Sequence, residues 1–434
     1  MVSFHVWTVG CQMNKADSER LQGGLEQLGL TPCDEPERAD VVVLNTCVVR
    51  QSAEDTATGM LGRLRRAKRD RPGQVVAVMG CMVGPTHDDL RRRFPHVDVW
   101  ARPQQFSPVI EAAAIKAGVD PGGCLNGLVP EAPHITSYVP IVHGCDKFCT
   151  FCIIPYRRGR EKSRPVDELI HEVTVMSERG VREVTLLGQN VDSYGHDLRP
   201  RRDLADLLEA VSEVDGIERV RFLTSHPNDM SPRIIQAVAE LPKVCENVNL
   251  PFQAGSDRIL AEMRRGYTSD QYLEKVQEVR ETIPGVTITT DLIVGFPGET
   301  AADFEDSLRI LDSVKFDKVH AASYSERDGT YASRRMPDTV DREEKKRRIQ
   351  AVSASQERIQ ASINADLLGR EFDILIDGRA RDRMHGRTRG DKLVYVTSGN
   401  PTPGDTVRVK VESASPWSLE GALRVVEREK VPVA

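Results

Sequence analysis

Three cysteines stand close together near the middle of the chain, where Cys145, Cys149 and Cys152 follow the pattern C-x3-C-x2-C. A structural zinc ion takes four protein ligands and a disulfide takes two cysteines, so a set of three favours a metal centre with one open position. Soft thiolates select zinc, copper(I) or iron–sulfur clusters. A [4Fe-4S] cluster held by three thiolates keeps its fourth iron free to bind a substrate or cofactor. The alternative is a zinc knuckle that borrows a fourth ligand such as His143.

A second set of three cysteines, Cys11, Cys47 and Cys81, is spread over the first part of the chain. Each follows an apolar run that predicts a strand, and these runs are Phe4–Val9, Val41–Leu44 and Val75–Met79. Neighbouring parallel strands end at one sheet edge about 4.8 Å apart, so the three sulfurs can converge on one site. Gly10 and Gly80 each precede a cysteine, where the backbone must pass close to something bulky. A second three-cysteine cluster is predicted, against the alternative of three small buried hydrophobic residues.

The strands that carry these cysteines alternate with amphipathic segments, predicted as helices from about Lys15 to Leu28 and from about Ser52 to Arg69. Ser52, with Asp55 three residues later, is predicted to be a helix N-cap with its reciprocal acid. Strands alternating with helices predict a doubly wound parallel sheet in an α/β domain over residues 1–120. Dinucleotide binding is a weak alternative, because no G-x-G-x-x-G follows the first strand.

A segment rich in proline and glycine, Pro121 to Thr136, is predicted to lead into a second domain over residues 131–365. Six βα units there predict a partial parallel (β/α)6 barrel whose working face is the carboxyl edge of its strands. The strands are predicted at Tyr138–Val142, Glu183–Leu187, Val220–Leu223, Asn247–Leu250, Val286–Val294 and Val319–Ser323. The charged segment 340–366 is predicted to be a helix with a solvated surface.

Polar motifs follow four of these strands, and each motif alone is compatible with an ordinary turn. Facing the Cys145–Cys152 loop, they together predict a pocket for a polar cofactor. A helix start at Gly255 could offer backbone N–H groups to a carboxylate. The candidate cofactor-binding residues are Phe151, Gln189, Asn190, Gln253 and Ser256.

After Gly369 the pattern changes to short strands with glycine and proline turns, which predicts a small all-β, OB-like barrel over residues 366–430. The strands are predicted at Glu371–Asp377, Lys392–Thr397, Thr406–Glu412 and Ala422–Val426. Five arginines at mostly even spacing are predicted to share one strand face and to form a phosphate track. They are Arg379, Arg381, Arg383, Arg387 and Arg389. The alternative is a scatter of solvated arginines.

The whole chain of 434 residues carries 59 basic and 65 acidic side chains, a net charge of −6, which excludes a uniformly basic protein but not a local basic patch. No run approaches the roughly 18 apolar residues of a membrane span, so a cytoplasmic protein with no membrane partner is expected. Nine cysteines in so long a chain are too few and too scattered for a disulfide scaffold. Cys33, Cys124 and Cys245 have no partner motif and are expected to be bystanders.

The cysteine motifs and their surroundings resemble the methylthiotransferases, a family of radical S-adenosylmethionine (radical SAM) enzymes. The resemblance covers nearly the whole chain, and Phe151 just before the third cysteine is typical of the radical SAM signature. The motifs that carry it are Gly10–Asn14, Asn45–Cys47, Gly80–Cys81, Gly144–Glu161, Leu250–Ser256 and Gly386–Thr388. Gly10–Asn14 is most similar to members that act on isopentenyladenosine in tRNA. His143, Asp146 and Arg157 depart from the family's common residues.

The resemblance implies an N-terminal methylthiotransferase domain, a radical SAM core and a C-terminal TRAM barrel. One [4Fe-4S] cluster, on Cys145, Cys149 and Cys152, would bind SAM and cleave it to a 5′-deoxyadenosyl radical. That radical would remove hydrogen from carbon 2 of the adenine next to the anticodon, at position 37. An auxiliary [4Fe-4S] cluster on the other cysteine set would carry the sulfur, and a second SAM would supply the methyl group. An aromatic C–H bond is too strong for acid–base chemistry at pH 7, so cofactors must do this step.

The implied partners are the tRNA anticodon stem-loop, whose single-stranded bases are reachable without opening a duplex, an electron donor and a sulfur donor. A monomer is expected, and no catalytic residue is predicted beyond the cluster ligands. The candidate RNA contacts are Arg157, Arg158, Arg160, Arg387 and Arg389. The alternatives are methylthiolation of threonylcarbamoyladenosine or of a ribosomal-protein aspartate, and, in another class, an RNA-binding protein with structural metal sites.

Overall fold

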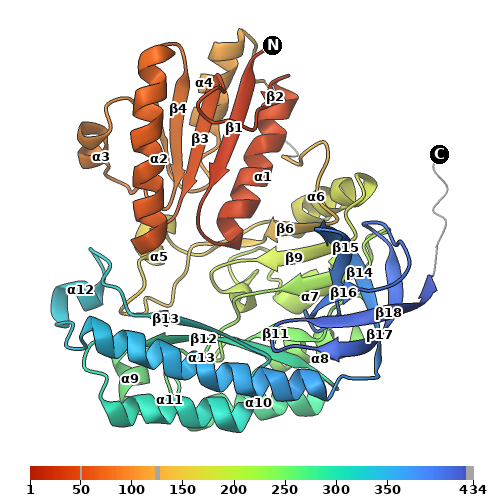
Figure 1. The fold of residues 1–434 in the computed structure, drawn as a ribbon. Coiled ribbons are helices and arrows are strands. Elements are labelled where there is room, and N and C mark those ends of the chain that lie inside the picture. Colours follow the sequence, from red (N-terminus) through yellow and green to blue (C-terminus); the bar gives the residue numbers. More distant parts are fainter. Residues whose placement is uncertain (49–50, 123–127, 427–434) are drawn as a thin grey trace.

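The computed structural model of the chain describes residues 1–48, 51–122 and 128–426. Its N-terminal part is a five-stranded sheet in the order β2-β1-β3-β4-β5, in which every pair is parallel (Figure 1). The strands that precede the three N-terminal cysteines are therefore neighbours. The bounds are β1 (Ser3–Thr8), β2 (Thr31–Pro32), β3 (Val41–Thr46), β4 (Val75–Gly80) and β5 (Val99–Ala101).

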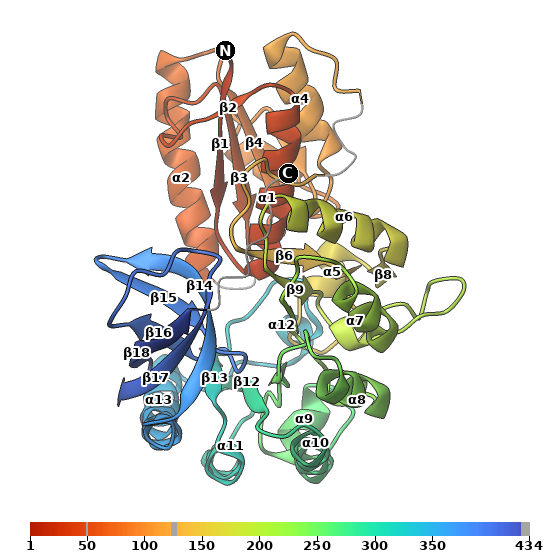
Figure 2. The same ribbon diagram turned by 90° about the vertical axis from the view of Figure 1, so that its right-hand side faces the viewer.

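Helices cover both faces of this sheet, because alternate residues of a strand face opposite sides. On one side Val41 packs in a hydrophobic cluster with α1 (Gln12–Gln27) and α4 (Ser107–Ala117). On the other side its neighbour Val42 packs with α2 (Gln51–Asp70). Figures 1 and 2 show the sheet between these helices. The predicted doubly wound parallel sheet is confirmed.

The starts of the first two long helices differ from the prediction. Helix α1 begins directly after Cys11, its N-cap residue, rather than near Lys15. The described part of α2 begins at Gln51, so Ser52 lies inside the helix and its prediction as the N-cap is wrong. Asp55 instead accepts a hydrogen bond of 3.0 Å from the Gln51 amide, one helical turn earlier.

All six predicted strands of the central part are present, with ends that differ from the predicted ones by a few residues. They form two parallel three-stranded sheets, β6-β9-β10 and β11-β12-β13, joined by a parallel bridge between Val220 and Val244. Together they curve into the predicted partial barrel (Figure 2). The bounds are β6 (Thr136–Pro140), β9 (Glu183–Leu187), β10 (Arg219–Phe222), β11 (Asn247–Asn249), β12 (Thr287–Val294) and β13 (Lys318–Ser323).

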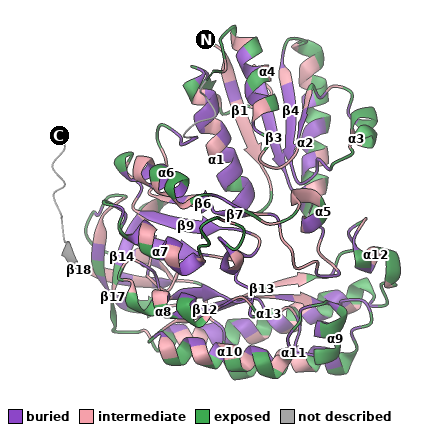
Figure 3. Cartoon of the chain, turned by 180° about the vertical axis from the view of Figure 1, so that it is seen from behind, coloured by how far each residue is buried: buried purple, intermediate pink, exposed green. Residues whose placement is uncertain are grey.

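Helices cover the outside of this barrel, and Figure 3 shows that they are exposed on their outer faces and buried toward the strands. They are α6 (Val166–Glu178), α7 (Leu204–Ser212), α8 (Pro232–Glu240), α9 (Asp257–Glu262), α10 (Ser269–Thr282), α11 (Ala301–Val314) and α13 (Arg342–Ala365). Capping boxes at Asp203, Thr268 and Thr300 fix the starts of α7, α10 and α11. Shorter elements are α3 (Asp88–Arg93), β7 (Val142–His143), α5 (Ile154–Arg158), β8 (Lys162–Ser163), η1 (Val191–Ser193) and α12 (Tyr331–Arg335).

Helix α13 is not the solvated surface that its charged sequence predicts. Val352 and Ile359 belong to the barrel's hydrophobic core, and the buried Arg348 pairs with the buried Glu299 at 2.5 Å. The charged side chains on the inner face of the helix are tolerated there because ion pairs, rather than water alone, satisfy them. None of the helices in the described ranges is long and apolar enough to cross a membrane, and this includes α13.

The C-terminal part is a closed five-stranded barrel in the order β14-β15-β16-β18-β17, which confirms the predicted small all-β barrel. The bounds are β14 (Glu371–Ala380), β15 (Arg383–Arg387), β16 (Leu393–Val396), β17 (Thr406–Ala414) and β18 (Leu419–Val426). The strand β15 was not predicted as a separate strand, because its arginines break the apolar pattern.

The prediction that five arginines share one strand face is wrong. Arg379 lies in β14, Arg381 lies in a tight turn with φ at +54°, and Arg383 and Arg387 lie in β15. Arg379 pairs across this antiparallel hairpin with Met384. The even spacing therefore runs through a hairpin, which divides the arginines between two strands and their turns.

Candidate functional site

The cysteine loop, residues 144–152, connects β7 to α5 at the carboxyl edge of the partial barrel. Gly144 opens the loop with φ at +76°, and a Cβ on it would lie 2.1 Å from the carbonyl oxygen of Arg160. Only glycine permits this backbone conformation together with so close an approach of two chain segments. The segment after α5 is thereby held against the loop.

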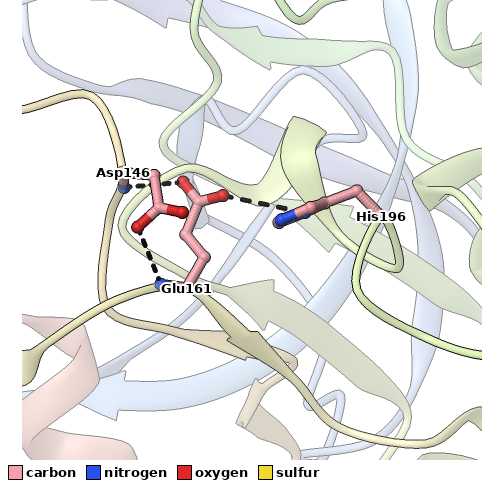
Figure 4. A group of neighbouring side chains, drawn as sticks. All are labelled: Asp146, Glu161 and His196. Atoms are coloured by element: carbon pink, nitrogen blue, oxygen red, sulfur yellow. Dashed lines mark hydrogen bonds and ion pairs between the residues drawn. The ribbon is translucent and has the colours of Figure 1, made fainter.

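Asp146 of the loop and Glu161 of the segment after α5 hold these two segments together (Figure 4). Each carboxylate accepts a hydrogen bond from the other residue's backbone N–H, at 3.1 and 3.2 Å, and Arg160 also pairs with Asp146 at 2.6 Å. His196 lies 3.7 Å from Glu161. In the described ranges, Asp146, Glu161 and His196 are the one group of three or more His, Cys, Asp and Glu side chains whose ligand atoms lie within 4.8 Å of one another. Because backbone and guanidinium donors already occupy the carboxylates, their role is to hold the loop.

The cysteine sulfurs lie farther apart than a bound tetrahedral zinc ion would hold them. Tetrahedral zinc with bonds of about 2.3 Å draws its sulfurs to within about 3.8 Å of one another. The described cysteines form no group as tight as 4.8 Å. Burial, followed by the charges of Cys149 and Cys145, raises the pKa of Cys152 to about 12, so the three sulfurs are still close enough to interact.

His143 does not serve as the fourth zinc ligand that the sequence left open. Its Nδ1 is hydrogen-bonded to the Gln104 amide at 2.5 Å, and it is absent from the lining of the cavity that the cysteines share. Burial and the charge of Arg158 lower the pKa of His143 to about 3. The histidine is a neutral group in the contact between the N-terminal and central parts.

The N-terminal cysteines lie at the carboxyl ends of three neighbouring strands, as predicted. Cys11 is exposed, whereas Cys47 and Cys81 are buried. Gly10 has φ at +132°, and a Cβ on it would lie 2.6 Å from Cys47 Cβ, so the predicted close approach is confirmed. A Cβ on Gly80 would lie 2.5 Å from the Asn45 side chain. Burial, opposed by the charge of Arg158 and assisted by the charges of Cys47 and Cys11, raises the pKa of Cys81 to about 11, which indicates three neighbouring sulfurs.

Both cysteine sets meet at one cavity of about 340 Å³, here called the cysteine cavity. Its lining includes five of the six predicted ligands, Cys11, Cys81, Cys145, Cys149 and Cys152. The sixth, Cys47, lies behind Gly10. Two metal centres built on these sets would therefore open onto the same cavity.

A larger cavity of about 700 Å³, the strand cavity, adjoins the first one. The two share Phe151, Cys152, Ile154, Gln253 and Asp291. Apolar residues of β12 and β13 supply much of its wall, with Gln51 and Arg327 at its polar side. The pair of cavities offers an apolar wall next to the open position of the core cysteine set, which suits the flat adenosine group of a cofactor or substrate.

The predicted cofactor residues are brought together at the cysteine cavity, with one exception. Phe151, Gln189, Asn190 and Gln253 line it. Asn190 is oriented by Asp229, to which its amide donates at 2.6 Å. Ser256 lines neither cavity: it is buried and donates to Asp303 at 2.5 Å.

A buried arginine, Arg158, connects the cysteine loop to the N-terminal sheet. Its side chain and that of Asp17 are both only 1% exposed and lie 3.3 Å apart, and Arg158 also donates to Asn14 at 3.1 Å. Burial opposes its charge, but the neighbouring thiol of Cys81 and the carboxylate of Asp17 raise the pKa of Arg158. Arg158 thus holds positive charge beside the N-terminal cysteines.

Arg265 occupies the matching place beside the core cysteines, and no sequence motif predicts it. Its guanidinium lies 3.4 Å from Cys149 Sγ and donates to the Tyr267 hydroxyl at 3.0 Å and to the Pro251 carbonyl at 3.4 Å. No carboxylate in the described part of the chain pairs with it. It lies in the turn between α9 and α10, far from the cysteines in sequence.

The other candidate RNA contacts lie in different surroundings. Arg157 packs against Gly84 of the N-terminal part, whereas Arg160 is 73% exposed. Arg387 pairs with Asp391 at 3.1 Å. Arg389 makes a two-pronged pair with Glu246 of the central part, at 2.7 and 2.8 Å.

The remaining cysteines have no metal-binding neighbours among the described residues. Cys33 donates weakly to the Glu35 carbonyl at 3.4 Å. Burial raises the pKa of Cys245, and the charge of the neighbouring Arg221 opposes this shift only in part. Cys124 lies outside the described residues.

Comparison with known families divides the chain into three matched regions. Residues 3–102 match the uncharacterized protein family UPF0004, residues 139–311 match the radical SAM superfamily, and residues 366–423 match the TRAM domain. The radical SAM match includes the cysteine loop and contains four of the six barrel strands in full. The N-terminal match ends just beyond β5.

Curated relatives match over nearly the whole length. The chain is 45% identical to the tRNA-2-methylthio-N(6)-dimethylallyladenosine synthase of Dehalococcoides mccartyi, over 98% of this chain and 99% of the relative. It is 44% identical to the enzyme of the same name from Roseiflexus, over 97% and 89%. Among solved structures, the fold is similar to the radical S-adenosylmethionine methyltransferase TsrM from Kitasatospora setae, with a TM-score of 0.56, 15% identity and 77% of each chain covered. With both cysteine sets at one cavity and relatives matched from end to end, the chain belongs to the radical SAM methylthiotransferases, in the family of the tRNA-2-methylthio-N(6)-dimethylallyladenosine synthases.

Proposed function

We propose that this enzyme converts N6-isopentenyladenosine next to the anticodon of tRNA, at position 37, into its 2-methylthio derivative. The relatives that share 40–45% of its residues are named for this reaction. The observation that carries the proposal is the cysteine cavity, which both cysteine sets line. Activating a C–H bond and delivering sulfur to the same carbon requires two centres that reach one atom, and this cavity provides the place.

The proposed cofactors are SAM and two [4Fe-4S] clusters, one on Cys145, Cys149 and Cys152 and an auxiliary one on Cys11, Cys47 and Cys81. When bound, the first cluster supplies the electron that cleaves SAM and the second carries the sulfur. The chain's own residues hold the ligands in place and keep water out, since most of these cysteines are buried or half-buried. Arg158 and Arg265 add positive charge beside the thiolates of each set.

The side chains at the strand ends orient SAM in this proposal. Gln189, Asn190 and Gln253 supply amide groups for its polar parts, and Phe151 supplies an aromatic wall shared by both cavities. The position of Asn190 is fixed in advance, because Asp229 accepts from it and is itself paired with Lys147 at 2.6 Å. Ser256 would act indirectly, by bracing this edge through Asp303.

The proposed partners are the tRNA anticodon stem-loop, an electron donor and a sulfur donor, and the enzyme is proposed to act as a cytoplasmic monomer. We divide the chain into a methylthiotransferase domain at 1–120, the radical SAM core at 131–365 and the TRAM domain at 366–430. Of the arginines considered for RNA, the exposed Arg160 is the best placed near the cysteine loop. Arg387 and Arg389 would contact RNA through the exposed third of their side chains.

The test is to incubate the iron-reconstituted protein with SAM, a reductant and tRNA that carries isopentenyladenosine, and then to digest the tRNA and identify its nucleosides by mass spectrometry. The 2-methylthio derivative is expected in the digest. SAM cleavage without the 2-methylthio derivative of isopentenyladenosine, together with methylthiolation of threonylcarbamoyladenosine or of a ribosomal protein when these are supplied instead, would contradict the proposed substrate.

A further inference from the structure

Three aromatic side chains lie in or beside the cysteine loop, and each has an arginine over its ring. Arg160 lies 5.5 Å from the ring centre of Phe148, Arg334 lies 5.9 Å from that of Tyr156, and Arg264 lies 4.2 Å from that of Tyr331. Tyr156 and Tyr331 are 41% and 40% exposed, which is unusual for large aromatic residues in this chain. We call these six residues the aromatic–arginine strip.

The six residues form one continuous surface although they come from three segments. Phe148 and Tyr156 meet edge to face at 6.2 Å. Tyr331 and Arg334 are three residues apart in helix α12, so they are neighbours on one helix surface. Ring contacts therefore link Arg160, Phe148, Tyr156 and Arg334 in one group and Tyr331 and Arg264 in another, and helix α12 joins the two groups.

The strip is fixed to the loop that carries the core cysteines. Ala332 of α12 donates its backbone N–H to Thr150 of the loop at 2.8 Å, and Thr150 in turn donates to the Met263 carbonyl at 3.2 Å. Phe148 lies between two of the cysteines, and Tyr156 lies in α5, directly after the third. Any ligand on the strip is held at a fixed distance from the cysteine cavity.

Two of the three arginines have no acidic partner within the described ranges of the chain. Arg264 and Arg334 are exposed, and no carboxylate there pairs with either of them, while Arg334 donates hydrogen bonds to the Gly329 and Thr330 carbonyls. Arg335, next along α12, is also exposed and also lacks such a pair. In a chain with a net charge of −6, this is a local concentration of uncompensated positive charge.

We propose that the strip binds the unpaired nucleotides that flank the modified adenosine in its RNA loop. This inference rests on the proposed function and names the surface that presents the substrate. Exposed rings provide faces on which bases of any sequence can stack, and the arginines beside them contact the phosphates. A double helix has no free base faces, so the strip selects a single-stranded loop. The C-terminal barrel is less suited to this task, because Arg389 is committed to Glu246 of the central part.

The test measures the affinity of the full-length, iron-reconstituted protein for a synthetic anticodon stem-loop RNA that carries isopentenyladenosine, by fluorescence anisotropy at several salt concentrations. The variant Tyr156→Ala/Tyr331→Ala is expected to bind at least about tenfold more weakly, as loss of base stacking implies, with an unchanged salt slope. The variant Arg264→Gln/Arg334→Gln is expected to bind more weakly and to lose about 0.7 from the log–log salt slope for each lost phosphate contact.

Two matched variants separate stacking from folding. Tyr156→Phe/Tyr331→Phe keeps both rings and should bind like the wild type. Trp417→Ala removes a 59% exposed aromatic residue of the C-terminal barrel and should also leave the affinity unchanged. Iron content and the visible absorbance of each variant show that it is folded.

The proposal is overturned if the alanine pair binds the stem-loop as tightly as the wild type, or if a fully paired RNA of equal length competes as well as the stem-loop. It is also overturned if an acidic peptide, rather than the RNA, depends on the strip for binding. These outcomes are distinct from failure of the proposed function, which is read from the thiomethylated nucleoside made by the wild type.

Discussion

At the scale of single residues, each cysteine set has one buried arginine, and the two arginines differ in how their charge is balanced. Arg158 has the carboxylate of Asp17 beside it. Arg265 is held only by neutral acceptors and by Cys149 Sγ, without a carboxylate in the described ranges. A buried cation without an acid is costly unless other negative charge compensates it. At the core site, the cysteine thiolates and their cluster must supply that charge.

This difference predicts the effect of Arg265→Met. Removing a positive charge next to the core cluster makes its reduction harder, so its potential should fall by on the order of 60 mV, about tenfold in the one-electron equilibrium. A redox titration followed by electron paramagnetic resonance measures this shift. Arg265→Lys keeps the charge and should stay closer to the wild type. A methionine variant with an unchanged potential would show that Arg265 only fills space.

At the scale of elements, the ends of the parallel strands bring the cysteines together, and glycine allows the chain to turn there. Gly10 ends the segment after β1 with φ at +132°, and its missing side chain leaves room for Cys47. Cys11 then starts helix α1 as its N-cap. Because Gly10 and Cys11 lie directly between the end of strand β1 and the start of helix α1, the position of the Cys11 sulfur depends directly on where these two elements end and begin.

Gly10→Ala should therefore damage the proposed N-terminal metal site. The new Cβ would lie 2.6 Å from Cys47 Cβ in a conformation that alanine rarely adopts, so we expect a loss of roughly 1–3 kcal/mol in unfolding free energy. Iron bound at this site should fall, while the core site keeps its iron. The matched control is Gly62→Ala in the exposed middle of α2, where nothing lies within 4 Å, and it should add about 0.5–1 kcal/mol. Equal effects of the two changes would contradict the packing argument.

At the scale of the whole molecule, the C-terminal barrel is docked on the central part by buried arginines. Arg219 of β10 donates to the Arg387 carbonyl at 2.6 Å and to the Asp373 carbonyl at 2.8 Å, while Arg221 donates to the Thr388 carbonyl at 2.8 Å. The contact uses the barrel's own backbone. This fixes the orientation of the barrel relative to the strands of the radical SAM core.

The pair between Glu246 and Arg389 adds a pH-dependent part to this docking. Burial raises the pKa of Glu246, but the hydrogen bonds from Arg389 lower it by more than burial raises it. The folded pKa therefore lies below the usual value. Such a group stabilises the fold above its unfolded pKa of about 4.3 and loses this contribution as the pH falls through the folded pKa. Glu246→Gln should cost about 1 kcal/mol at pH 7.

A double-mutant cycle of Glu246→Gln and Arg389→Ala, by urea unfolding of the iron-free protein, measures this coupling. The coupling energy should be present at pH 7 and should shrink as the pH approaches 3.5. A coupling that is zero at pH 7, or that grows toward acid, would contradict the ion pair as a docking contact.

The ligands and strands could be predicted from the sequence, whereas the supporting contacts could not. Cysteines at strand ends such as Cys47 and Cys81 are visible because an apolar run stops directly before them. Arg265 could not be predicted, since it approaches Cys149 only through the fold. The prediction that the arginines of the β14–β15 hairpin share one strand face was wrong, because even spacing does not reveal where a strand turns back. Ser256 looked like a cofactor ligand, but its partner Asp303 lies in a different helix.

In the proposed function, the two cysteine sets at one cavity divide the reaction between them, and the variant Cys47→Ala separates their roles. Cys47 belongs to the N-terminal set and lines no part of the core site. SAM cleavage and thiomethylated nucleosides in digested tRNA are measured in the same reaction, with the wild type alongside. The variant should still cleave SAM but should make no 2-methylthio nucleoside. A wild-type yield of that nucleoside from the Cys47→Ala protein would contradict it.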